Sequence, residues 1–138
     1  MTPTSTVKYL GDLRTECVHL KSKNTFITDA PTDNNGKGEA FSPTDTVATA
    51  LASCMMTVMG IKARDLDVDL TGSLATVEKI MSANPRRIAR INVVLDIPVM
   101  PDEKSVKILE NTARTCPVLL SLHEDIIKDI TINWNVNS

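Results

Sequence analysis

The sequence predicts an α+β fold for this chain of 138 residues. Three observations favour that class. A long helix with almost no charge is expected in the first half of the chain. Alternating apolar and polar residues after it predict a long β-hairpin. Short β-prone runs precede the helix, and two further helices and a strand follow the hairpin. The order βββ–α–ββ–α–α–β is typical of helices packed against antiparallel sheets.

The central helix is the element with the clearest signals. Ser42, Pro43 and Asp45 form a capping-box-like start, with proline at the first helical position. No charged residue occurs over 46–61, so we expect the helix to be buried on most sides. Continued to residue 63 it would be roughly 30 Å long at about 1.5 Å per residue. A second copy of the same helix is one way to cover it, so a homodimer is expected.

The whole chain, 1–138, is expected to form a single domain. Its expected segments are an N-terminal β-meander and loop (1–41), the central helix (42–65), the hairpin (66–98), two helices with a Cys-Pro junction (102–123) and a final strand (128–136). In the meander, strands are expected at 7–13, 16–22 and 25–28, with a tight turn near Arg14.

Two details of the expected hairpin depend on the alternation of side chains. Val68 and Leu70 are expected in its first strand. In its second strand the pattern places Ile88 on the same face as Arg90 and Asp96, opposite an apolar face. The sequence therefore predicts one polar or mixed face and one core-facing side.

Composition and charge exclude several classes of function. Hydrophobic residues make up 42% and charged residues 23% of the chain, as in soluble globular proteins. The net charge of −2 gives no support for nucleic-acid binding. The apolar run 46–61 is shorter than the roughly 20 residues that span a bilayer, and residues 1–6 do not resemble a signal peptide. We expect a cytoplasmic protein without a membrane partner.

The cysteines are the residues whose chemistry stands out. Cys17 lies in an expected strand with no motif around it, and Cys54 lies in an apolar helix, where packing alone could explain it. Cys116 precedes Pro117 at the expected start of a helix, where N–H groups and the helix dipole favour a thiolate. In a reducing compartment these thiols are not a structural disulfide framework. The two histidines, His19 and His123, are isolated and lack the spacing of metal ligands.

The two cysteine motifs together carry a resemblance. Cys54 follows Pro43 by eleven positions within Ser-Pro-Thr-Asp-Thr-Val-Ala-Thr-Ala-Leu-Ala-Ser-Cys-Met, and Cys116 begins a later Cys-Pro-Val. This pattern resembles the OsmC/Ohr family, which is named for an osmotically inducible protein and the organic hydroperoxide resistance protein. The order of expected elements agrees over nearly the whole chain. The resemblance implies an OsmC-like fold, an intertwined homodimer whose long central helices pack together under two sheets.

The resemblance also implies a chemistry. Cys54 would be the peroxidatic thiolate that attacks an organic hydroperoxide and becomes a sulfenic acid, and Cys116 would condense with it to a disulfide. A small dithiol, lipoyl-linked in some members, would restore the thiols, and no metal or other cofactor is expected. Met55, Met56 and Met59 are candidates to line an apolar substrate pocket, with ordinary core packing as the alternative.

The implied site needs a cation held by a carboxylate. Arg14 is the candidate cation, by its place in the first hairpin. Many members carry Glu directly after the proline that matches Pro43, whereas this chain has Thr44. Asp45 and Glu39 are possible substitutes, and a third option is that neither serves.

Because Thr44 stands where many members carry Glu, two rival functions stay open beside the peroxidase. One is a non-enzymatic OsmC-like dimer that binds a small apolar ligand or senses oxidants through its cysteine pair. The other is a structural dimer with incidental cysteines.

Overall fold

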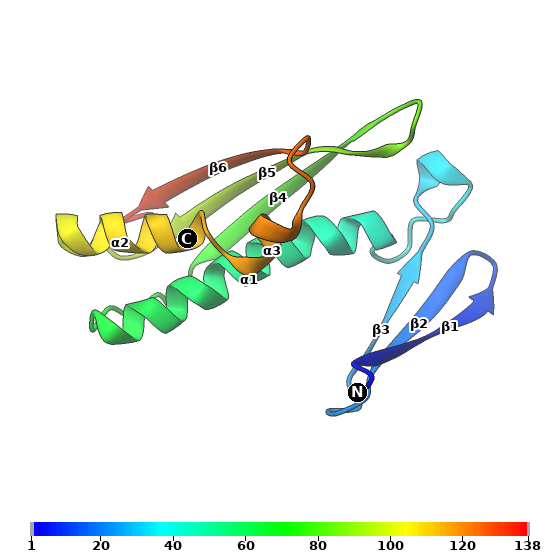
Figure 1. Ribbon diagram of the computed structural model, residues 1–138, viewed down its shortest axis with the longest axis horizontal. Coiled ribbons are helices and arrows are strands. Elements are labelled where there is room, and N and C mark those ends of the chain that lie inside the picture. Colours follow the sequence, from blue (N-terminus) through cyan, green and yellow to red (C-terminus); the bar gives the residue numbers. More distant parts are fainter. Residues whose placement is uncertain (1, 138) are drawn as a thin grey trace. The chain divides into compact units, whose positions relative to one another are not determined.

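The structure is a computed structural model that describes residues 2–137. The chain divides into two compact units, Met1–Val47 and Ala48–Ser138, and each is described by itself. The two units contain two separate three-stranded sheets. Together with the helices of Figure 1, they confirm the predicted α+β class.

The first unit is the predicted β-meander (Figure 1). It consists of β1 (Ser5–Gly11), β2 (Arg14–His19) and β3 (Thr25–Asp29), paired antiparallel in that order. A short 3-10 turn, η1 (Thr32–Asn34), follows. The first two strands begin two residues earlier than predicted. The turn lies at Asp12 and Leu13, both with positive φ, so Arg14 is the first residue of β2 and not part of the turn.

This unit has almost no apolar interior in the single chain. Among residues 2–47 the buried side chains are polar and belong to Thr28, Asp29 and Ser42. Large apolar side chains are exposed instead: Val7, Tyr9, Leu10, Leu13, Phe26, Ile27, Phe41 and Val47. A three-stranded sheet without a packed hydrophobic face is at best marginally stable in water. The unit therefore presents apolar surface that a folded protein would be expected to cover.

The central helix, α1 (Pro43–Asp65), begins with the predicted capping box. The Asp45 backbone N–H donates to Ser42 Oγ, and the Ser42 N–H donates to Asp45 Oδ2, each at 3.0 Å. Two orphan backbone donors are satisfied reciprocally in this way. The local sequence thus determines where the helix starts.

Only one side of α1 is covered in the single chain. Its buried side chains are Ala48, Leu51, Ala52, Met55, Met59 and Ala63. After Pro43, its exposed, uncharged side chains are Val47, Thr49, Ser53, Thr57 and Ile61. A single copy of the chain therefore buries only one side of α1, and burial on most sides stays a prediction that depends on a second copy.

Helix α1 is longer than the apolar run 46–61 from which the sequence analysis argued against a membrane span. At 23 residues it is long and apolar enough to cross a membrane by length and composition alone. The core helix of a soluble protein passes the same test, and the buried side of α1 belongs to the hydrophobic core of the second unit.

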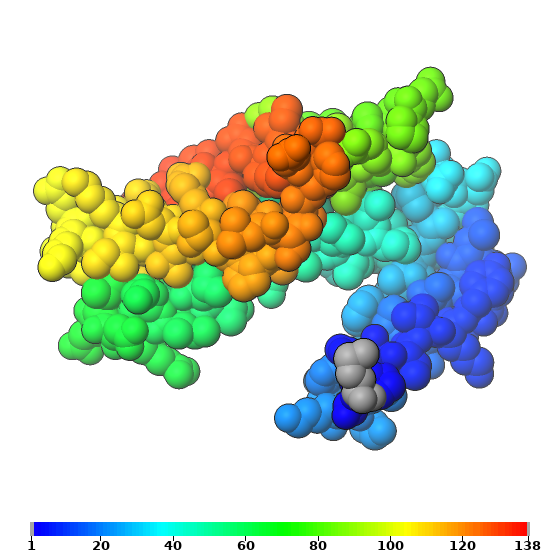
Figure 2. Space-filling model, viewed as in Figure 1, coloured from blue at the N-terminus to red at the C-terminus, as the bar shows by residue number. Residues whose placement is uncertain are grey.

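The second unit contains β4 (Leu74–Ser82), β5 (Arg87–Ile97) and β6 (Ile127–Trp134), with β5 in the middle. It also contains α2 (Glu103–Ala113) and α3 (Pro117–Ser121). The helices lie along one face of the sheet (Figure 1). Figure 2 shows the region of α2 and α3, in yellow and orange, lying across the green central helix. The fully buried β5 residues Ile91, Val93, Leu95 and Ile97 face this core.

Three details of the sequence-based prediction for this unit were wrong. Residues 66–73 form no strand, because α1 ends in a turn whose Val68 N–H donates to Ala63 O at 2.9 Å. Ile88 belongs to the core, because the β4–β5 register shifts between Ile80 and Met81 and reverses the alternation there. The third is that β6 pairs parallel with β5, so the sheet is mixed and not antiparallel throughout.

We predict that Ser42→Ala lowers the free energy of unfolding by about 1 kcal/mol, because it removes the oxygen that caps α1. Asp102→Ala is the matched control, since Asp102 is the N-cap of α2 but makes no side-chain cap hydrogen bond. Asp102→Ala should lower the free energy of unfolding by less than Ser42→Ala does. Urea unfolding at one fixed protein concentration measures both variants, and equal losses would contradict the assigned role of Ser42.

Candidate functional site

The structure brings the two predicted working thiols together. Cys54 lies in the middle of α1, half-buried, and Cys116 is the N-cap residue of α3 and is fully buried. Cys54 lies close enough to Cys116 for the two thiols to influence each other's ionisation. All three cysteines of the chain are free thiols. Two neighbouring free thiols are the chemical requirement for a reversible dithiol–disulfide pair.

The environment of Cys116 keeps it protonated. Burial raises the pKa of its thiol above the usual value, and the neighbouring Cys54 side chain raises it further. The backbone N–H groups of Leu119 and Val118, at the start of α3, act in the opposite direction but do not prevail. The sequence correctly placed Cys116 beside a helix start. The inference that this position favours a thiolate was wrong, because burial outweighs the amide groups.

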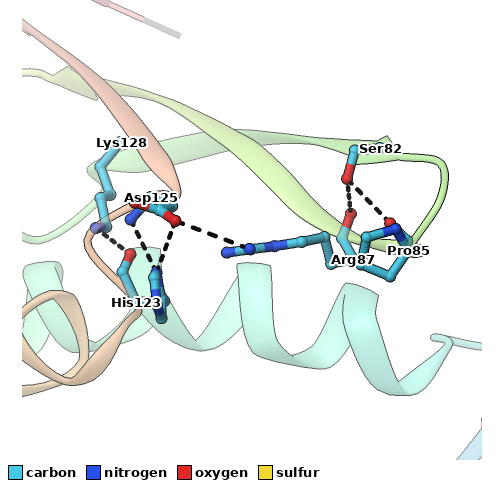
Figure 3. A network of polar contacts seen from close by, with 6 residues as sticks. All are labelled: Ser82, Pro85, Arg87, His123, Asp125 and Lys128. Carbon is cyan, nitrogen blue, oxygen red and sulfur yellow. Dashed lines mark hydrogen bonds and ion pairs between the residues drawn. The ribbon is translucent and has the colours of Figure 1, made fainter.

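The segment that follows α3 is held by a network of polar contacts (Figure 3). The Lys128 ammonium donates to His123 O at 2.8 Å, and the Asp125 N–H donates to His123 Nδ1 at 3.0 Å. The guanidinium of Arg87, at the start of β5, lies 4.0 Å from Asp125 Oδ2. These groups are largely exposed, so each contact contributes little to stability. They give His123 a structural surface role, as the sequence indicated.

A cavity of about 500 Å³ lies beside the C-terminal half of α1. Its lining includes Met56, Met59, Leu95 and Ile97, but neither Cys54 nor Cys116. Met55 is fully buried in the core and does not line it. Two of the three methionines singled out in the sequence thus border a cavity, and that cavity is not built around the thiols.

The predicted cation belongs to the first unit. Arg14 stands directly opposite Asp29 in the β2–β3 register, and its Nη2 donates to Asp29 Oδ2 at 3.1 Å. Glu39 Oε1 lies 3.9 Å from the same nitrogen. The pKa of Asp29 is lowered, chiefly by the backbone N–H of Glu39 and then by the hydrogen bond from Arg14. The cluster is an ionised carboxylate paired with a guanidinium.

Asp29 is the partner of Arg14 that sequence reasoning missed. The acids proposed from the sequence were Asp45 and Glu39. Asp45 accepts the Ser42 N–H in the capping box, and Glu39 contacts Arg14 at the limit of an ion pair. An Asp at the end of the β-prone run that follows the strand of Arg14 was the available signal. Using it would have required the β2–β3 register.

The remaining polar candidates supply no site. Cys17 is half-buried in β2, and its sulfur lies 4.0 Å from Thr15 Oγ1. His19 Nδ1 contacts Ser22 Oγ at 2.6 Å on the surface. Within residues 2–137, no group of three or more Cys, His, Asp or Glu side chains could hold a metal ion.

The chain thus combines two three-stranded sheets with a long central helix whose Cys54 lies near the buried Cys116. Residues 36–131 match the family model described as OsmC-like protein. The chain belongs to the OsmC-like family.

Solved structures agree with this assignment. A Psychrobacter arcticus protein, described as osmotic stress induced and part of a detoxification response, is 53% identical, with a TM-score of 0.92 over 96% of each chain. An OsmC-like protein from Mycoplasma pneumoniae is 16% identical, with a TM-score of 0.79 over 97% of each chain. An organic hydroperoxide resistance protein OsmC from Legionella pneumophila is 14% identical, with a TM-score of 0.74 over 96% of this chain and 98% of its own. The last two support the fold alone. No curated protein matches the chain significantly.

We predict that Cys116 is alkylated far more slowly than Cys54 when the native, reduced protein meets iodoacetamide near neutral pH. Cys116 is fully buried, so the reagent rarely reaches its sulfur. Its pKa is also raised, so little of the thiol is present as the reactive thiolate. Peptide mass spectrometry over time measures the two rates. The denatured chain is the control, in which both cysteines should react alike. Equal rates in the native protein would contradict the assigned environment of Cys116.

Proposed function

We propose that this protein is a thiol-dependent peroxidase that reduces organic hydroperoxides to alcohols. The observation that carries the proposal is the interaction of the half-buried Cys54 with the fully buried Cys116. Membership of the OsmC-like family supports it, and the Legionella relative is named an organic hydroperoxide resistance protein.

The proposed reaction has three steps. The Cys54 thiolate attacks the terminal oxygen of the hydroperoxide; a sulfur–oxygen bond forms, the oxygen–oxygen bond breaks and the alkoxide leaves as an alcohol after taking up a proton. The resulting sulfenic acid reacts with Cys116, a disulfide forms, and water leaves. An external dithiol, lipoyl-linked or similar, then donates two electrons to restore both thiols.

The environments of the two thiols support this division of roles. A peroxidatic sulfur must meet its substrate, and Cys54 is the more accessible of the pair. A resolving thiol should stay protonated and shielded until the sulfenic acid forms, and burial gives Cys116 both properties. Arg14 is proposed to stabilise the thiolate and the departing alkoxide, the kind of electrostatic role that often contributes most to catalysis.

We further propose that the protein works as a homodimer in the cytoplasm. The exposed, uncharged side of α1 and the apolar side chains of the first unit are the supporting observations. A second copy would cover such surfaces with matching apolar groups.

A rival function is favoured by one observation. The cavity of about 500 Å³ does not include the thiols, as expected if the dimer bound a small apolar ligand without reacting with it. A ligand found there, with both thiols slow toward peroxides, would support a binding protein. A disulfide formed by mild oxidant without catalytic turnover would support an oxidant sensor.

We predict that the reduced protein consumes cumene hydroperoxide faster than hydrogen peroxide when dihydrolipoamide is the reductant. Cys54→Ser should abolish this activity, because it removes the nucleophile. Cys17→Ser is the matched control and should leave the rate within about twofold of the wild type, since Cys17 takes no part in the proposed steps. Peroxide consumption that does not depend on Cys54 would contradict the proposed function.

We predict that the protein elutes with a mass twice its 15.1 kDa in size-exclusion chromatography with light scattering. Phe26→Asp should shift it toward the monomer, because a charge would be buried in the proposed interface. Met100→Asp, at an exposed apolar residue of the second unit outside the surfaces assigned above, should stay dimeric. A monomeric wild-type protein would overturn the proposed assembly.

A further inference from the structure

The pairing of Arg14 with Asp29 is asymmetric in its exposure. Asp29 is only 1% exposed, whereas the Arg14 side chain is 33% exposed. The two residues stand directly opposite each other in neighbouring strands, and one hydrogen bond of 3.1 Å joins Nη2 to Oδ2. The buried carboxylate is therefore a fixed anchor, while part of the guanidinium remains open to another group.

Asp29 is itself held from two sides. Its Oδ2 also accepts the Glu39 backbone N–H at 3.0 Å, and its own N–H donates to Phe41 O at 2.9 Å. The Glu39 amide and Arg14 lower the pKa of the carboxyl group, so it remains ionised throughout the neutral range. A charged acceptor tied down in this way gives a guanidinium one preferred position.

The Arg14–Asp29 contact uses fewer hydrogen-bonding atoms of both side chains than a two-bond ion pair would. Asp29 Oδ1 is buried and has no hydrogen-bond partner among residues 2–137. A two-bond, fork-to-fork arrangement would have satisfied that oxygen and been more stable. Arg14 has five N–H donors, and within the same residues its side chain donates one hydrogen bond, to Asp29. Most donors of the guanidinium are thus left for another anion.

We propose that Asp29 is the positioning residue for Arg14 in the peroxidase reaction: it orients the guanidinium so that its unused donors can bind the reacting thiolate and the departing alkoxide. The inference rests on the proposed function. Glu39 is a poorer anchor, because its carboxylate is 60% exposed and lies 3.9 Å away. Its backbone N–H serves the arrangement by holding Asp29.

A double-mutant cycle on kcat/KM for cumene hydroperoxide tests the proposal, with rates expressed per titratable Cys54 thiol. Asp29→Asn should lower kcat/KM on the order of tenfold or more, because a misplaced catalytic group loses most of its effect. In an Arg14→Ala background the same Asp29→Asn change should alter the rate by less than about twofold, since no guanidinium is left to orient. Glu16→Gln, an acid on the same face of β2, is the matched control and should stay within about twofold.

The outcomes separate the two hypotheses. Losses that add up in the double variant show that Asp29 acts independently of Arg14, and overturn the positioning role while the peroxidase stands. A wild-type protein without Cys54-dependent turnover overturns the proposed function, and this inference falls with it. Non-additive losses with an active wild type support both.

A second variant keeps the test decisive if Asp29→Asn does not fold. Arg14→Lys retains the positive charge and a possible ion pair with Asp29, but it lacks a planar fork with donors in several directions. We expect kcat/KM of Arg14→Lys to fall to within about threefold of the Arg14→Ala value. Full activity of Arg14→Lys would mean that charge alone suffices, and would overturn a role for Asp29 in orienting the guanidinium.

Discussion

The packing of one side of α1 against β5 is the interaction on which the rest of the second unit depends. Leu51, Met55 and Met59 on the helix and Ile91 and Leu95 on the strand are all fully or almost fully buried. Burying a side chain of this size contributes about 1.5–3 kcal/mol. Because the core contains few aromatic residues, this aliphatic and sulfur-containing layer must supply most of the stabilisation. The position of Cys54 follows from it, since the same helix carries the thiol.

The two thiols acquire different chemistry from their positions relative to that core. Cys54 lies between the buried and the exposed sides of α1, so it stays partly accessible. Cys116 enters the core at the junction between α2 and α3, where Pro117 starts a new helix. Burial there outweighs the helix amides and keeps Cys116 protonated. A pair of identical side chains is thereby divided into an accessible thiol and a protected one.

Features encoded by neighbouring residues could be predicted from the sequence, and features that depend on distant pairing could not. The capping box at Ser42 and the junction at Cys116 are local, and both were found. The core position of Ile88 depends on a bulge shared by β4 and β5, and the parallel alignment of β6 depends on how a distant segment returns to the sheet. Asp29 was missed for the same reason, because its pairing with Arg14 comes from strand register and not from spacing along the chain.

In the first unit, the exposed apolar side chains of the strands and the Arg14–Asp29 pair belong to the same small sheet. The buried side chains of this unit are polar, and the ionised Asp29 is among them. Such a cluster is costly to bury unless its surroundings are fixed, because an unpaired buried charge is strongly unfavourable. The sheet that carries Arg14 cannot supply that rigidity from a hydrophobic core of its own, since its large apolar side chains are exposed. Under the proposed assembly a second copy would cover these side chains, and the order of the Arg14–Asp29 pair would then depend on dimer formation. Peroxidase activity and assembly would in that case be lost together, for a physical reason that lies in the first 47 residues and not in the cysteine pair.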